Sequence, residues 1–389
     1  MSCALPAMLV RTHLRRQGKV RVLFVITSLG LGGAERQVMD VADRLAANGH
    51  TVTVANLTGQ VCVQPVDSRI RVVPLGMSKT LLGFVLGYFR LLQLVRNCRP
   101  DVVHSHMVHA NLLCRLVRLC VFMPRLVCTA HSTNEGGRLR MFLYRLTDGL
   151  ADISTNVSHD AVTAFEALGA VPRGSMLAVP NGIDCKRFRP DATMRQEVRR
   201  TAGIDGNQRI ILAVGRFDLA KDYPNLLNAF GQVVNKIPEA RLWIAGDGPL
   251  RCRMEGLSNE LGLSGTVSFL GARNDVPNLM RAADVFVLSS AWEGFGLVVA
   301  EAMASELRVV ATDCGGVREV LGGAGFLVPP RNPMALSLAM ERALALSPTD
   351  ARALGRKARE RVLEQYSLER AVEEWERIYA DTPPMPRVR

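Results

Sequence analysis

Short apolar runs alternate with helical patterns along most of this chain. The first run, Val20–Thr27, leads into a Gly-rich turn and then a segment with Val38, Val41 and Leu45 at helical spacing. Similar runs, typical of strands buried in a parallel sheet, occur at 51–57, 100–107, 125–132, 151–158 and 176–184, and again at 209–217, 240–249, 266–271, 283–290, 307–316 and 324–330. The pattern predicts an α/β protein built from two Rossmann-like domains.

The two series of strands meet near Asn181–Gly206. We therefore expect an N-terminal domain over residues 1–182 and a C-terminal domain over residues 183–365, consistent with a length of 389 residues. An amphipathic pattern over Tyr366–Tyr379 predicts a C-terminal helix, within residues 366–389, that crosses back onto the first domain. Ligands of open α/β sheets bind beyond the carboxyl ends of the strands, so two facing domains predict a cleft between them.

Charge is distributed unevenly between the halves. The chain carries a formal net charge of +12; residues 1–180 hold 20 Lys and Arg against 10 Asp and Glu, whereas the remainder holds 28 against 26. The basic half indicates an anionic surface or substrate, with a generally basic proteome as the alternative. The nine cysteines are scattered without a CxxC spacing, which argues against disulfides or a zinc site and for a reducing cytosol.

Two loops of the second half have the composition of a phosphate site. Gly215 ends a strand and is followed by Arg216 and Lys221, a fork-shaped and a compact cation before a helix. Either residue alone could equally be a solvated surface charge. The stretch "WEGFGLVVAE" (292–301) also follows a strand, and it predicts a helix that begins near Gly296 with free N–H groups for an anion.

Glu293 and Glu301 flank this predicted helix start. With Glu293 in the loop and Glu301 in the second turn, the two carboxylates can bracket a ligand whose middle is a phosphate. The alternative for Glu301 is a surface glutamate, but its apolar neighbours favour a buried, partnered carboxylate.

The motifs together resemble the family 4 glycosyltransferases, retaining enzymes of the GT-B fold that use nucleotide-sugar donors. The matching segments cover about Val20–Tyr379 and keep the order of the family. They are "GLGGAERQV", "TAHS", "VPNGID", "GRFDLAKDYPNLL", "GDGPL", "FLGARNDVP", the two glutamates and "VVATDCGGVREV".

The resemblance implies a role for each matching residue. Arg216 and Lys221 would hold the donor diphosphate and stabilise charge on the leaving nucleotide, beside Gly215. Glu301 would bind the ribose hydroxyls, and Glu293 would bind the transferred sugar with the backbone of residues 295–297. These last contacts come from Phe295, Gly296 and Leu297.

Further roles fall on loops of both halves. Gly33 would let the backbone approach the phosphate, and His131 would orient the sugar near its reacting carbon. Arg273 would border the nucleobase, while His106 and Asn134 would line the acceptor side of the cleft.

Two details qualify the resemblance. His104 and His106 share one face of a strand, but without a nearby carboxylate or thiol at ligand spacing a metal site is disfavoured. After Glu301 the family usually has a Gly and a Pro, where this chain has Glu306 and Arg308. A non-Gly residue at such a helix end costs about 1 kcal/mol.

Two apolar, arginine-containing segments, 77–99 and 111–125, carry the information about the acceptor side. They fit either docking on an anionic membrane or core helices with solvated basic edges. No uncharged apolar run approaches the roughly 18–20 residues that span a bilayer.

The sequence therefore predicts a retaining hexosyltransferase-type enzyme, without metal or other cofactor. It would move a sugar from a UDP- or GDP-sugar to a glycan or lipid-linked acceptor in cell-surface polysaccharide or glycolipid synthesis. It would act in the cytoplasm, peripherally on the inner face of the membrane, and without nucleic acid, for which no motif is present. The alternatives are a nucleotide-sugar 2-epimerase and a non-catalytic membrane-associated module.

Overall fold

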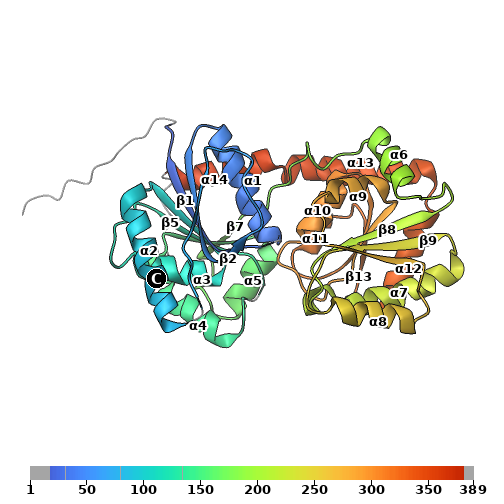
Figure 1. The fold of residues 1–389 in the computed structure, drawn as a ribbon, viewed down its shortest axis with the longest axis horizontal. Helices are drawn as coiled ribbons and strands as arrows, with labels where there is room; N and C mark the ends of the chain where they lie inside the picture. The colour runs from blue at the N-terminus through green and yellow to red at the C-terminus, as the bar shows by residue number, and fades with distance from the viewer. Residues whose placement is uncertain (1–17, 31, 79, 134, 381–389) are drawn as a thin grey trace, which may run out of the picture.

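Two parallel β-sheets organise the computed structural model, which describes residues 18–30, 32–78, 80–133 and 135–380 (Figure 1). The first sheet has seven strands in the order β3-β2-β1-β4-β5-β6-β7, and the second has six in the order β10-β9-β8-β11-β12-β13. The strands are β1 (Arg21–Leu29), β2 (Thr51–Val61), β3 (Arg71–Pro74), β4 (Val102–His106), β5 (Leu126–Ala130), β6 (Ile153–Asn156), β7 (Met176–Ala178), β8 (Arg209–Val214), β9 (Ala240–Ala245), β10 (Val267–Gly271), β11 (Val285–Leu288), β12 (Arg308–Thr312) and β13 (Phe326–Val328). The predicted α/β class is confirmed, and only the short edge strand β3 was not predicted.

Helices cover both faces of the first sheet. Along β1, Val22, Phe24 and Ile26 pack with α1 (Gly33–Ala47), whereas Leu23 and Val25 pack with α2 (Leu81–Cys98) and α3 (Val108–Val117). Successive side chains of a strand point to opposite faces, so a run that is apolar throughout needs a helical layer on each side. The remaining elements are α4 (Arg138–Thr147), the 3-10 helix η1 (Asp148–Leu150) and α5 (His159–Ala167).

The second sheet is covered in the same way. Ile210, Leu212 and Phe286 lie in a core with α9 (Val276–Ala282), α10 (Leu297–Ala304) and α13 (Pro348–Gln365). The alternate positions Ile211 and Val285 pack with α7 (Tyr223–Lys236) and α12 (Pro333–Ala345). The other elements are α6 (Ala192–Thr201), the 3-10 helix η2 (Leu219–Lys221), α8 (Arg251–Glu260) and α11 (Val317–Leu321).

The chain crosses between the domains twice, and the two crossings lie side by side. Ile183 forms a parallel bridge with Ser367, through its N–H to Tyr366 O (2.7 Å) and its carbonyl to Leu368 N (2.9 Å). A Cβ at Gly182 would lie 2.7 Å from the Ala371 side chain, so this approach requires glycine. The boundary predicted after residue 182 falls here, between β7 and α6.

After the second crossing, α14 (Leu368–Tyr379) packs on the first domain, as predicted. Its residues Leu368, Val372, Trp375 and Ile378 belong to the same core as α1. The red helices α13 and α14 in Figure 1 therefore connect the two lobes along one side. Residues 381–389 lie outside the described part of the chain.

The departure noted after Glu301 affects the turn between α10 and β12. Glu306 has φ 60°, the left-handed conformation that favours glycine. Arg308 is held instead by carbonyl groups, with Nε 2.8 Å from Asp284 O and Nη1 2.9 Å from Ala343 O. The turn thus keeps the backbone of a glycine turn with a glutamate in it.

Candidate active site

The site residues gather at the points where the strand order of each sheet reverses. Loops after β8 and β11, adjacent central strands of the second sheet, carry Lys221 and Glu293. In the first sheet, His106 ends β4 and His131 follows β5. A reversal of strand order opens a crevice at the carboxyl ends of the strands, which is where α/β proteins bind ligands.

Lys221 and Glu293 form the central ion pair, with Nζ 2.5 Å from Oε1. Ser290 Oγ donates to the same carboxylate oxygen at 2.7 Å. The two loops are joined further by Ser289 Oγ to Lys221 O (2.7 Å) and by Ala291 N to Ala220 O (2.8 Å). The pair is therefore held in place by both loops.

Burial disfavours the charged form of Lys221, but the adjacent Glu293 carboxylate outweighs burial and raises the pKa of the lysine. The ammonium is thus a permanent cation at neutral pH. Arg216, in the same loop, is exposed and adds a second cation at the mouth of the site. Gly215 precedes it, and its carbonyl accepts a hydrogen bond from Tyr223 Oη (2.9 Å).

Helix α10 begins where the sequence predicted it. Gly296 is its N-cap, at φ 84°, and Leu297 is the first helical residue. The Phe295 ring is buried against Tyr366, so only its backbone is available to a ligand. A Cβ at Gly33 would lie 3.4 Å from Leu297 Cδ2, which shows that the N-terminus of α1 in the first domain reaches the start of α10.

The domains also touch at Gly294, in the loop between β11 and α10. A Cβ at Gly294 would lie 2.3 Å from the backbone oxygen of His131. Ser158 Oγ donates to Gly294 O at 2.7 Å, and the N–H groups of His159 and Asp160 bind the Glu319 carboxylate at 3.2 and 2.8 Å. The structure thus describes the cleft with its two walls in contact.

Glu301 lies buried at the domain boundary, and burial raises its pKa to about 8. Arg36 and Arg187 act against this shift, whereas Asp40 adds to it. Within the described residues, the Glu301 carboxylate forms no ion pair or side-chain hydrogen bond. A buried acceptor without a partner is suited to bind hydroxyl groups of a ligand.

Sequence reasoning did not identify Arg36, Asp40 and Arg187 as neighbours of Glu301. Burial raises the pKa of Asp40 to about 6 and lowers that of Arg36. The two are four residues apart on α1, a spacing that could have drawn attention to them. Arg187 follows the crossing at residue 183, and only the fold places it near Glu301.

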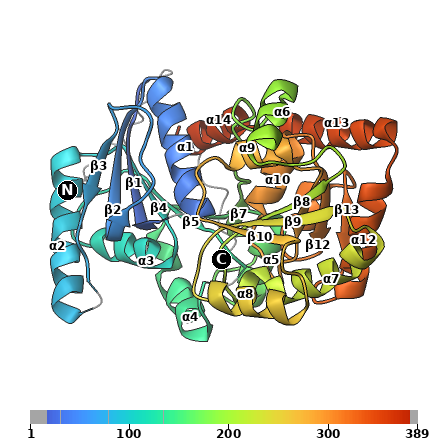
Figure 2. The ribbon, with the colours of Figure 1, turned by 45° about the vertical axis from the view of Figure 1, so that its right-hand side comes forward.

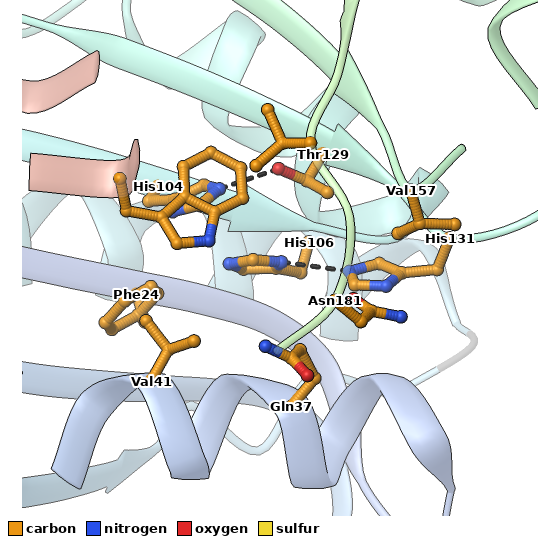
Figure 3. A pocket seen from close by; sticks show the side chains of 11 residues that line it. Phe24, Gln37, Val41, His104, His106, Thr129, His131, Val157 and Asn181 are labelled. Atoms are coloured by element: carbon orange, nitrogen blue, oxygen red, sulfur yellow. Dashed lines mark hydrogen bonds between the residues drawn. The ribbon is translucent and has the colours of Figure 1, made fainter. Parts of the chain in front are cut away.

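A small pocket lined by both polar and apolar side chains lies next to His131 (Figure 3). His106 Nδ1 is 3.0 Å from His131 Nε2, and the opposite nitrogen of His106 has no partner within the described residues. Gln37, from α1, is also buried with its amide unpaired, and the pocket has room for about one water molecule. His106 is only 4% exposed. The prediction that His106 lines the cleft therefore needs correction, because it supports His131 from behind.

Burial keeps the histidines of this pocket neutral. It lowers the pKa of His131 to about 4 and those of His104 and His106 well below the usual value. Both ring nitrogens of His104 form hydrogen bonds, Nδ1 with Tyr379 Oη (2.6 Å) and Nε2 with Thr129 Oγ1 (2.7 Å). A neutral His131 can orient a hydroxyl group but carries no charge for a phosphate.

The remaining predicted residues lie apart from this centre. Arg273 follows β10, the edge strand of the second sheet, and its guanidinium binds Asp275 at 2.8 and 2.6 Å. Asn134 lies outside the described residues. Its neighbour Glu135, which was not predicted, accepts the His131 N–H at 3.0 Å and fixes that loop.

Two family models together match most of the chain. "Glycosyltransferase Family 4" matches residues 31–187, and "Glycosyl transferases group 1" matches residues 194–361. Solved structures share the fold: a sucrose-phosphate synthase from Thermosynechococcus elongatus superposes with a TM-score of 0.82 at 24% identity, covering 92% of this chain and 98% of that one. HepE of Anabaena, in complex with UDP-glucose, gives a TM-score of 0.80 at 20% identity over 92% and 99%.

Curated relatives agree in class. The putative glycosyltransferase EpsD of Bacillus subtilis is 29% identical over 335 residues, 83% of this chain and 87% of the relative. N-acetyl-alpha-D-glucosaminyl L-malate synthase of Bacillus anthracis is 29% identical over 292 residues, 72% and 74%. Fold and site thus define a glycosyltransferase with the GT-B architecture. The chain belongs to glycosyltransferase family 4, as its motifs predicted.

Proposed function

We propose that this protein transfers a sugar from a nucleoside-diphosphate sugar to an acceptor with retention of anomeric configuration. The observation that carries the proposal is the Lys221–Glu293 pair, 2.5 Å apart beside the N-terminus of α10. It sets a fixed cation and a fixed hydrogen-bond acceptor side by side, one suited to a diphosphate and the other to sugar hydroxyls.

In the proposed complex, the diphosphate lies at the N-terminus of α10 between Lys221 and Arg216. Negative charge grows on the leaving phosphate in the transition state, and both cations stabilise it. Glu293 holds the sugar, Glu301 holds the ribose and neutral His131 orients a sugar hydroxyl. Arg273 borders the nucleobase. The acceptor hydroxyl attacks from the side on which the phosphate leaves and passes its proton to the departing phosphate oxygen.

We infer that the donor is a UDP-sugar or a GDP-sugar. HepE binds UDP and UDP-glucose, and an Escherichia coli relative, 25% identical over 248 residues, is a UDP-Gal:alpha-D-GlcNAc-diphosphoundecaprenol galactosyltransferase. These names favour UDP and support a glycan or lipid-linked acceptor in polysaccharide or glycolipid synthesis. Metal independence, and action as a peripheral protein on the inner face of the membrane, remain predictions.

The test is a panel of UDP-, GDP- and ADP-sugars in a thermal-shift assay, followed by donor hydrolysis with and without EDTA. A donor at about 100 times its dissociation constant stabilises the folded protein by about 2.7 kcal/mol. Proton NMR of the released sugar or product should show the anomeric configuration of the donor.

Other results would decide against transfer. Inversion at the sugar C2 without release of a sugar identifies a 2-epimerase, and inversion at the anomeric carbon rejects retention. A protein that no nucleotide-sugar stabilises is a non-catalytic module.

A further inference from the structure

The outer surface of the first domain is unusually apolar around α2. Of the 22 large apolar side chains exposed among the described residues, 12 lie between residues 81 and 146. On α2 they include Leu82, Leu86 and Phe89, the last 59% exposed. The turn after α3 adds Leu119 and Phe122, at 66% and 84%. We call the exposed apolar side chains of α2 and of residues 116–122 the apolar face.

The local structure explains why α2 presents these residues outward. Gly83, Gly87 and Leu91 point inward, and a Cβ at Gly83 or Gly87 would collide with Ser78 or Met77. The loop before α2 therefore packs tightly against the glycine side of the helix. Because the first half of α2 is apolar all round, its other side meets solvent.

A groove joins the two parts of the apolar face. It runs between Phe84 and Phe89 of α2 on one side and Leu116 of α3 and Leu119, in the turn after α3, on the other. Tyr88 Oη donates to Cys120 Sγ (3.0 Å) beside it and ties the two helices together. Figure 2 shows α2 at the edge of the molecule away from the second domain, and no other part of the described chain covers its exposed apolar side chains. The sequence-based alternative of core helices with solvated basic edges does not describe the first half of α2, because its exposed side chains are apolar.

The charged residues around the apolar face are predominantly basic. Residues 80–147 contain nine arginines and only two acidic residues, Asp101 and Glu135. Asp101 binds Arg21 (3.2 Å) and Glu135 accepts from Tyr144 Oη (2.5 Å), so neither carboxylate is free. Arg96 continues the helical spacing of Leu82, Leu86 and Phe89 and is exposed.

We propose that the apolar face docks on a membrane surface with anionic headgroups. The apolar side chains would enter the headgroup region, and the arginines would pair with lipid phosphates. A second copy of the chain fits less well, because a two-fold contact would place one arginine-rich surface against another. No helix within the described residues is long and apolar enough to cross a membrane, so contact would be at the surface.

The position of α4 links this surface to the site. The helix packs against α3 and begins at Arg138, seven residues after His131. It exposes Phe142 and Arg145. An amphiphilic acceptor held in the membrane would therefore meet the protein close to the His131 side of the cleft. This use of the surface rests on the proposed transfer to a lipid-linked acceptor.

The experiment is co-sedimentation of the full chain with vesicles of phosphatidylglycerol and phosphatidylcholine in equal amounts, against phosphatidylcholine alone. We expect binding to the anionic vesicles that weakens with salt. The double variant Leu86→Ser with Phe89→Ser should bind at least about tenfold more weakly, since two large apolar side chains are lost. Its matched control is Met334→Ser with Leu338→Ser, exposed apolar residues of α12 in the other domain.

A second pair tests charge: Arg96→Gln with Arg145→Gln should weaken binding to anionic vesicles about 25-fold, roughly fivefold for each arginine. Its control is Arg352→Gln with Arg356→Gln on α13. If the apolar variant fails to fold, the arginine pair decides.

Wild-type protein that stays in solution at low salt would overturn the proposal. So would unchanged vesicle binding by both pairs, or a dimer in light scattering that the apolar variant abolishes while vesicle binding persists. Donor stabilisation and donor hydrolysis, measured without vesicles, should be the same in wild type and both pairs. Loss of those signals in the wild type would instead count against the proposed function.

Discussion

The two glutamates at the ends of "WEGFGLVVAE" are eight positions apart but differ in what holds them. Glu293 is paired with Lys221 and Ser290, all within the second domain. Glu301 is buried at the domain boundary, where its charged neighbours Arg36 and Asp40 come from the other domain. The first site is built by one domain, whereas the second exists only when both domains meet. Experiments on each glutamate should therefore separate donor chemistry from domain assembly.

Breaking the Lys221–Glu293 pair should have the largest effect on sugar transfer. Lys221→Ala or Glu293→Gln removes a group aimed at the leaving phosphate or the sugar, and we expect transfer to fall about 10²–10³-fold. The measurement is kcat with saturating donor. Lys236→Ala, which removes an exposed lysine paired with Glu341, should have little effect and serves as the control. Turnover close to wild type in either variant would contradict the assigned roles.

Breaking the domain contact should reduce kcat while leaving donor affinity largely intact. A Cβ at Gly294 would lie 2.3 Å from His131 O, so Gly294→Ala forces the cleft apart. We expect kcat to fall about tenfold or more, because a displacement of about 1 Å can cost up to 10²-fold. Gly256→Ala, in a helix where a Cβ meets nothing, is the matched control. Equal loss of donor affinity and kcat would show that the contact belongs to the donor site.

The buried Glu301 should make stability depend on pH. Its pKa is about 8 in the folded protein and near 4.5 when exposed, so the folded state holds an extra proton between these values. The free energy of unfolding should therefore fall as pH rises from about 5 to 9, by on the order of several kcal/mol. Glu301→Gln should lose this part of the slope in denaturant unfolding. An unchanged slope would mean that the carboxyl is already ionised at neutral pH.

We expect the smallest effect at Glu306, in the turn that follows α10. Glu306 has φ 60°, so Glu306→Gly should stabilise the protein by about 1 kcal/mol without changing kcat. The gain is limited by the loss of its 4.0 Å contact with Arg359. Glu306→Ala keeps a Cβ at this turn and should show no such gain in thermal unfolding. A destabilised glycine variant would mean that the Arg359 contact dominates.

Much of the donor loop geometry could be read from the sequence because it is local. The start of α10 at Gly296–Leu297 follows from a strand, a Gly-containing turn and an apolar helical stretch that are consecutive in the chain. Arg216, Lys221 and Glu293 each follow a strand end, and parallel strands bring their carboxyl ends to one edge. The motif resemblance placed these residues in the correct family.

The buried residues around His131 could not be predicted from the sequence in the same way. His106 was predicted to line the cleft and not to be a buried support, and Gln37 was not predicted at all. The contact between His106 and His131 joins two strand ends, and the unpaired Gln37 comes from α1 on the face of the sheet. Which of these polar side chains is sealed from water depends on how α14 covers the pocket, a packing property without a local sequence signal.

The sequence by itself determined the alternation of strands and helices, the two-domain division and the strand-end positions of the donor residues. These depend on side-chain period and on residues near each other in the chain. Only the tertiary structure decided that Glu301 is buried beside α1, that Gly294 meets His131, and that half of α2 faces outward. Burial depends on which surfaces of distant segments meet, and the same apolar helix pattern fits a core or an exposed docking face until its neighbours are placed.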